Sequence, residues 1–133
     1  MLKYLYLYLI SFGIFLVVDL IWLNLIAKNL YQKEIGSLLL KTPKLIPAFL
    51  FYALFIVALL ILVLIPGIQS YTLTKTLLIG AVFGFITYAT YDLTNLATLK
   101  GWSLKMTIID LVWGTSVSTL VTFLGYIIGS KIL

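Results

Sequence analysis

The chain contains no cysteine, no histidine and no arginine among its 133 residues. Without cysteine there is no disulfide framework and no thiolate metal site. Without histidine there is no imidazole general base, no histidine ligand for haem or zinc, and no Ser-His-Asp triad. The polar groups that remain are carboxylate, amide, hydroxyl, phenol, indole and ammonium, which favour protons and hard cations over soft metals. We therefore expect no cofactor.

Charge is scarce as well: charged residues make up 10% of the chain and hydrophobic residues 63%. Mean hydropathy is +1.20. A soluble domain of this size cannot bury so much apolar surface, because small domains leave a large fraction of the chain exposed. All nine basic residues are lysine, so the planar guanidinium that binds phosphate at two points is missing. The composition indicates a membrane protein, and nucleic-acid binding is not expected.

Four apolar runs are long enough to cross a hydrocarbon core, which takes about 20 helical residues. These runs cover residues 4–26, 45–65, 74–99 and 104–128. The sequence thus predicts an all-α polytopic membrane protein, a bundle of four transmembrane helices forming one domain over residues 1–133. Asp19 interrupts the first run and no convincing small-x-small cleavage site follows it, so we expect a retained helix rather than a signal peptide.

The links between the runs carry helix start and stop signals. The first link, residues 27–44, mixes lysines with apolar residues and is expected to form a short amphipathic helix at the membrane interface. The Pro66-Gly67 pair is expected to end the second span as a turn. Gly101 is expected to cap the end of the third span, and Ser103 the start of the fourth.

The lysines are shared unequally between the two membrane surfaces. The links after the first and third spans carry Lys28, Lys33, Lys41, Lys44, Lys100 and Lys105, whereas the surface with both termini carries Lys3, Lys75 and Lys131. Basic residues are enriched in cytoplasmic loops. This asymmetry favours a multi-pass protein of the cytoplasmic membrane with both termini outside.

Three of the four acidic residues lie inside the apolar runs, as Asp19, Asp92 and Asp110. An ionisable side chain in a membrane costs at least a few kcal/mol and usually faces the bundle interior, so each is a candidate functional group. Asp19 and Asp92 lie in the later halves of the first and third spans, which cross the membrane in the same direction. Asp110 lies in the first half of the fourth span, which crosses in the opposite direction. All three therefore fall in one leaflet, about 7 to 14 Å below the lysine-rich surface. We expect a polar pocket that opens on that surface.

Helical phase adds neighbours to the carboxylates, because residues three or four positions apart share a helix face. The candidate ligand- or ion-binding residues are Asp19, Trp22, Tyr88, Tyr91, Asp92, Asn95, Asp110 and Trp113. The two indoles are expected to wall a cation or an apolar ligand, while the amide and a phenol hydrogen-bond a carboxyl group. Neighbouring like charges disfavour ionisation, so at least one of the three carboxyl groups is expected to be neutral near neutral pH.

Small residues mark expected helix contacts at Gly80-x-x-x-Gly84 and at Gly125-x-x-x-Gly129, with Gly114 one turn after a carboxylate. Such pairs serve either as internal contacts or as the face of a homodimer, and we favour the internal role. Buried aspartates can also act as plain hydrogen-bonding links between helices, and tryptophan as an interfacial anchor. Three carboxylates in one leaflet favour a functional site over a structural role, because placing like charges close together does not help to hold helices together.

Three phrases carry a family resemblance: the long one from Tyr91 to Trp102, the one from Asp110 to Gly114, and the early one from Asp19 to Trp22. They resemble an uncharacterised family of small bacterial four-span membrane proteins, domain of unknown function 2177. The similarity covers essentially the whole chain. It implies a bacterial four-span protein but brings no activity with it.

Three classes of function remain open. The first is binding or transport of a proton, a cation or a small amphipathic molecule at the carboxylates. The second is a non-enzymatic assembly or interaction protein, whose polar seam locks the bundle or a partner helix. The third and weakest is an intramembrane enzyme with Asp92 and Asp110 as an acid dyad, similar to intramembrane aspartyl proteases in its Tyr91-Asp92 phrase but lacking the Gly-x-Gly-Asp phrase. The expected partners are membrane lipid and a small cationic or amphipathic ligand.

Overall fold

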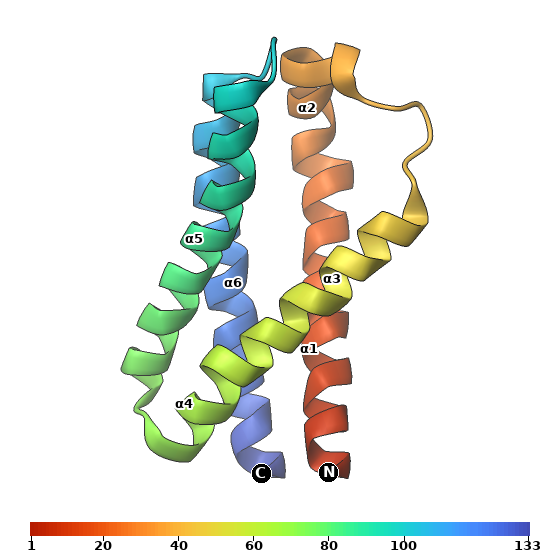
Figure 1. Ribbon diagram of the computed structural model, residues 1–133. Coiled ribbons are helices and arrows are strands. Elements are labelled where there is room, and N and C mark those ends of the chain that lie inside the picture. The colour runs from red at the N-terminus through yellow and green to blue at the C-terminus, as the bar shows by residue number, and fades with distance from the viewer.

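The computed structural model describes residues 1–133, and it is helical over nearly all of them, with no strands (Figure 1). Four helical segments are long and apolar enough to cross a membrane. They are Leu2–Leu38, Leu45–Ser70, Leu73–Thr98 and Leu104–Ile132. The predicted all-α, four-span architecture is confirmed.

The first segment runs without a break through α1 (Leu2–Ile21), a π-helical turn η1 (Trp22–Ile26), α2 (Ala27–Ile35) and a short 3₁₀ turn η2 (Gly36–Leu38). The expectation of a separate amphipathic helix at the interface is wrong, because α2 continues the first span. No proline and no glycine occur between Gly13 and Gly36, so nothing breaks the helix at the interface.

The second segment consists of α3 (Leu45–Leu59), a π-helical turn η3 (Leu60–Leu64) and α4 (Ile65–Ser70). The expected turn at Pro66-Gly67 is wrong, since the helix continues through both residues. Proline lacks a backbone N–H and clashes with the preceding turn of an α-helix. Here the wider π turn precedes it, and the proline occupies the first turn of α4, where the missing N–H is tolerated.

The helices α5 (Leu73–Thr98) and α6 (Leu104–Ile132) are joined by a tight turn. The expected cap is confirmed at Ser103, whose hydroxyl accepts the backbone N–H three residues later at 3.0 Å. Gly101 has a φ of +78°, a left-handed conformation that favours glycine. It lies in the turn rather than at the helix cap, because α5 already ends at Thr98 and Leu99 takes the cap position.

Small residues let α5 and α6 lie side by side along their length (Figure 1). A Cβ atom added at Gly80 would meet Thr122, and one added at Gly84 would meet Ser118 and the carbonyl oxygen of Gly114. The glycines of the second small-residue pair, Gly125 and Gly129, face side chains of α1 and of the second span in the same way. Both pairs thus form contacts inside one chain.

The two ends of the bundle differ. Both termini and the turn between α4 and α5 lie at one end, which we call the terminal end, whereas α2 and the turn between α5 and α6 lie at the other, which we call the lysine-rich end (Figure 1). A hydrophobic core fills the interior between α1, α6 and the tilted second span. Its buried members are Leu7, Phe15, Ile56, Leu59, Leu60, Val63, Leu64, Val117 and Val121.

Candidate functional site

The carboxyl groups of Asp19, Asp92 and Asp110 are buried, with exposed fractions of 7%, 0% and 7%. They come from α1, α5 and α6, and they converge because α6 packs against both of the other helices. The Asp110 side chain lies close enough to interact with both of the others. We call these three residues the carboxylate cluster.

Asp19 is held by two donors from other helices. The phenol O–H of Tyr52 on α3 donates to one carboxylate oxygen. The indole N–H of Trp113 on α6 donates to the other at 3.2 Å. One carboxylate therefore ties α1, α3 and α6 together, and hydrogen bonds to a charged acceptor are the stronger kind.

Asp110 is held from the other side, through α2. It accepts a hydrogen bond from the Tyr31 hydroxyl at 3.0 Å, and that hydroxyl accepts one from the Trp22 indole at 3.1 Å. The Trp22 and Trp113 rings are stacked, with centroids 4.3 Å apart and an interplanar angle of 6°. The two indoles stack on each other, and their N–H groups are used within this hydrogen-bond network.

The π turn explains how Tyr31 reaches the cluster. Tyr31 lies nine residues after Trp22, and at about 100° per residue an unbroken α-helix would place the two side chains on opposite faces. The π turn Trp22–Ile26 absorbs one extra residue, so the two side chains point about 80° apart instead. This local widening directs the phenol toward Asp110.

Asp92 differs from the other two carboxyl groups, because neither of its oxygens receives a hydrogen bond from an N–H or O–H donor. The carboxyl group of Asp110 lies beside it. Two ionised carboxylates have no hydrogen to share, so a bond between them requires a proton on one. The arrangement can therefore hold a proton between two acidic side chains, which we call the acid pair.

The remaining candidate residues divide into two groups. Tyr88 lies beside the cluster, with its ring packed against Gly114, where a larger residue would collide with it. Tyr91 is 58% exposed and meets the Trp102 ring edge-on at 5.8 Å. Asn95 is half-buried and lies near that phenol rather than donating to a carboxylate. The structure thus brings Tyr88 to the cluster and leaves Tyr91 and Asn95 outside it.

Two partners were missed from the sequence, Tyr31 and Tyr52. A signal existed for Tyr52, because it carries the only polar side chain in α3. A lone phenol in an otherwise apolar span favours a hydrogen bond to a partner when it is buried. No comparable signal marked Tyr31, since a regular helix would direct it elsewhere.

Four apolar spans around a buried polar cluster define a multi-pass integral membrane protein. Residues 4–127 match the family described as "Predicted membrane protein (DUF2177)", and the chain belongs to that family. No curated protein matches the chain, and neither does any solved structure.

A first prediction concerns the hydrogen bond between Tyr52 and Asp19. Tyr52→Phe removes one donor from a buried carboxylate and should lower the free energy of unfolding by about 1 to 3 kcal/mol. Tyr6→Phe is the matched control, because this phenol is 50% exposed and has no hydrogen bond. Thermal unfolding in detergent measures both. Equal midpoints for the two variants would contradict the assignment of Tyr52 as a donor to the cluster.

Proposed function

We propose that the protein binds protons at the acid pair, as the basis of a proton-linked binding or transport function in the membrane. The observation that carries this proposal is the state of Asp92, which is fully buried and receives no hydrogen bond from any N–H or O–H donor. Another carboxyl group, that of Asp110, lies beside it. A buried carboxylate without donors is costly when ionised, and a proton shared with Asp110 relieves that cost.

A proton fits this site better than a metal ion or an organic ligand does. No three acidic side chains lie close enough together to hold a metal ion, and hard cations require several oxygen ligands. The stacked indoles occupy the space next to the cluster that an amphipathic ligand would need. The same crowding disfavours a dyad enzyme, whose substrate would have to reach the fully buried Asp92.

Access to the acid pair is expected from the lysine-rich end. The hydrophobic core and the tight seam between α5 and α6 lie on the other side of the cluster, toward the terminal end. Water does not cross such close packing, so release toward the terminal end needs a rearrangement of helices. We place the lysine-rich end in the cytoplasm of a bacterial cell, because basic residues favour that side.

The experiment is an infrared measurement of protonated carboxyl groups in purified protein, with three substitutions. The parent should show one protonated aspartate at neutral pH. Asp92→Asn should remove this signal, because Asp92 carries the proton. Asp110→Asn should shift the frequency of the signal without removing it, because the burial of Asp92 still disfavours its ionised form. Asp19→Asn should leave it in place, since Asp19 is held by two donors of its own. Glu34→Gln is a control outside the cluster, where the carboxylate accepts from Ser103.

Proton exchange with the solvent distinguishes a proton-binding site from a structural hydrogen bond between helices. Addition of acid or base should change the carboxyl signal reversibly in the parent. Sodium ions, potassium ions and lipophilic amines, tested by thermal shift, should stabilise the parent little if the proton is the ligand. A signal that survives in Asp92→Asn, or one that never responds to pH, would refute the proposal in favour of a purely structural cluster.

A further inference from the structure

The charged side chains at the terminal end of the bundle all carry the same sign. They are Lys3, Lys75 and Lys131. The acidic side chains lie toward the other end, three in the carboxylate cluster and Glu34 on α2. An anion at the terminal end therefore meets attraction from several lysines and no repulsion from an acidic side chain.

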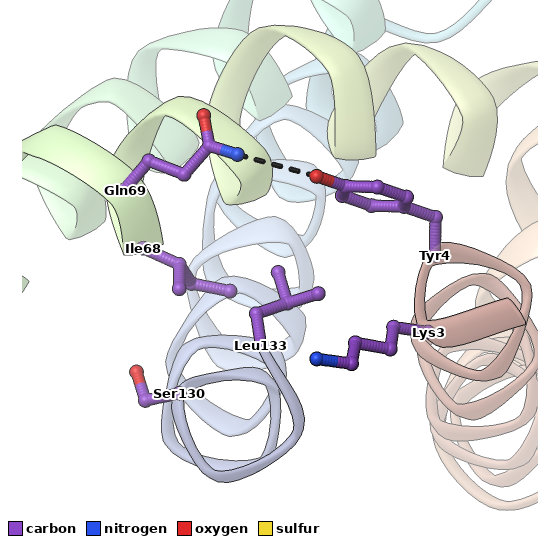
Figure 2. A pocket seen from close by; sticks show the side chains of 6 residues that line it. All are labelled: Lys3, Tyr4, Ile68, Gln69, Ser130 and Leu133. Atoms are coloured by element: carbon purple, nitrogen blue, oxygen red, sulfur yellow. Dashed lines mark hydrogen bonds between the residues drawn. The ribbon is translucent and has the colours of Figure 1, made fainter. Parts of the chain in front are cut away.

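A cavity of about 320 Å³ lies at this end, between α1, α4 and the end of α6 (Figure 2). The residues around it are Lys3, Tyr4, Ile68, Gln69, Ser130 and Leu133. Figure 2 shows the ammonium group of Lys3 extending from α1 across the opening toward α6. The amide of Gln69 on α4 donates a hydrogen bond of 3.3 Å to the hydroxyl of Tyr4 on α1.

The hydrogen-bonding capacity of the lining residues suits an anion. The Tyr4 oxygen accepts from Gln69, which leaves its own O–H free to donate to a ligand. The Lys3 ammonium supplies up to three further donors. Ser130 donates its hydrogen to the Tyr126 carbonyl at 2.6 Å, so it offers a ligand only an acceptor. Ile68 adds an apolar wall.

We propose that this cavity binds the phosphate group of an anionic membrane lipid. The ammonium and phenol donors match phosphate oxygens, and the free acceptor of Ser130 suits a hydroxyl on the lipid headgroup. The cavity lies at the end of a membrane-spanning bundle, where lipid phosphates are concentrated. Its mixture of donors and an apolar wall fits a lipid better than a free anion. This site lies at the opposite end from the acid pair and does not depend on proton binding there.

Native mass spectrometry of the whole chain in detergent, titrated with phosphatidylglycerol, tests the proposal. Phosphatidylcholine, which has no net charge, and inorganic phosphate serve as the comparison ligands. The parent should bind phosphatidylglycerol more tightly than phosphatidylcholine. Lys3→Gln should weaken phosphatidylglycerol binding about fivefold, which is about 1 kcal/mol per basic residue near a membrane surface. Tyr4→Phe should weaken it by a smaller factor, because only one donor is lost.

Lys75→Gln is the matched control, since it removes the same charge from the same end. Its ammonium lies 4.0 Å from the centre of the Tyr71 ring and does not line the cavity. This variant should change phosphatidylglycerol affinity less than twofold.

Equal losses of affinity in Lys3→Gln and Lys75→Gln, or no loss in Lys3→Gln, would overturn the site. Displacement of the lipid by inorganic phosphate at equal concentration would overturn the assignment to lipid. Unchanged thermal unfolding would show that the variants remain folded.

Discussion

Gly84→Leu is expected to abolish folding of the bundle or to reduce its thermal stability severely. A Cβ atom at this position meets both the Ser118 side chain and the carbonyl oxygen of Gly114. The carbonyl belongs to the backbone of α6 and cannot rotate away, so α5 and α6 would have to separate. Overpacking typically costs about 1 to 3 kcal/mol and occasionally more. Because leucine adds three further carbons beyond Cβ, we expect a loss at or above the upper end.

Gly13→Leu is the matched control for this prediction. It makes the same substitution inside a membrane-spanning helix, but no atom lies within 4 Å of the new Cβ. Its thermal unfolding midpoint in detergent should stay close to that of the parent, while Gly84→Leu should yield little folded protein. Equal behaviour of the two variants would show that the seam between α5 and α6 does not determine the stability of the fold. This result would also test whether the small-residue pair works inside the chain.

The four spans and the meeting of three carboxylates were predictable, because both depend on properties that lie along the chain. Apolar runs of sufficient length define spans. The leaflet of Asp19, Asp92 and Asp110 follows from their position in each span and from the alternating direction of the spans. Neither argument requires the angle or distance between helices. The binding role of these residues stays a proposal, since position alone names no ligand.

The partners of the carboxylates were less predictable, because they depend on how helices depart from regular geometry. Tyr31 reaches Asp110 only because the π turn after Trp22 shifts the helix face. Tyr52 reaches Asp19 because α3 crosses in front of α1 at an angle (Figure 1). A prediction that assumes a regular α-helix for each span includes neither the widened π turn nor the angle at which α3 crosses α1.

The same dependence on local geometry applies to the two indoles and to the wrong prediction of a turn at Pro66. Helical periodicity predicts that Trp22 and Trp113 share a helix face with the neighbouring carboxylates. Whether the two indoles enclose a ligand or stack on each other depends on the distance between the first span and α6. Here they stack at 4.3 Å. Pro66 was expected to end a helix because proline removes a hydrogen bond. A preceding π turn, Leu60–Leu64, accommodates the proline, and such turns have no reliable signal in sequence.

The sharpest separation of structure from function comes from the same substitution at two aspartates. Asp19→Val leaves the O–H of Tyr52 and the N–H of Trp113 without an acceptor in a buried site. Each lost partner costs about 1 to 3 kcal/mol, so the free energy of unfolding should fall by about 2 to 6 kcal/mol. Asp92→Val removes a carboxyl group that receives no hydrogen bond from an N–H or O–H donor. Replacing a poorly satisfied buried acid with an apolar side chain is often neutral or stabilising, so its unfolding free energy should stay within about 1 kcal/mol of the parent or rise.

Thermal unfolding and the carboxyl infrared signal, measured on both variants, give opposite expected patterns. Asp19→Val should unfold early, and below its midpoint it should keep the protonated carboxyl of the acid pair. Asp92→Val should unfold normally and lack that signal. A buried polar residue whose removal does not lower stability is a candidate functional group, because stability and activity compete at functional sites. Asp92 would then be such a residue. If Asp92→Val loses as much stability as Asp19→Val, then Asp92 is a structural link between α5 and α6, and the proposed proton site is refuted.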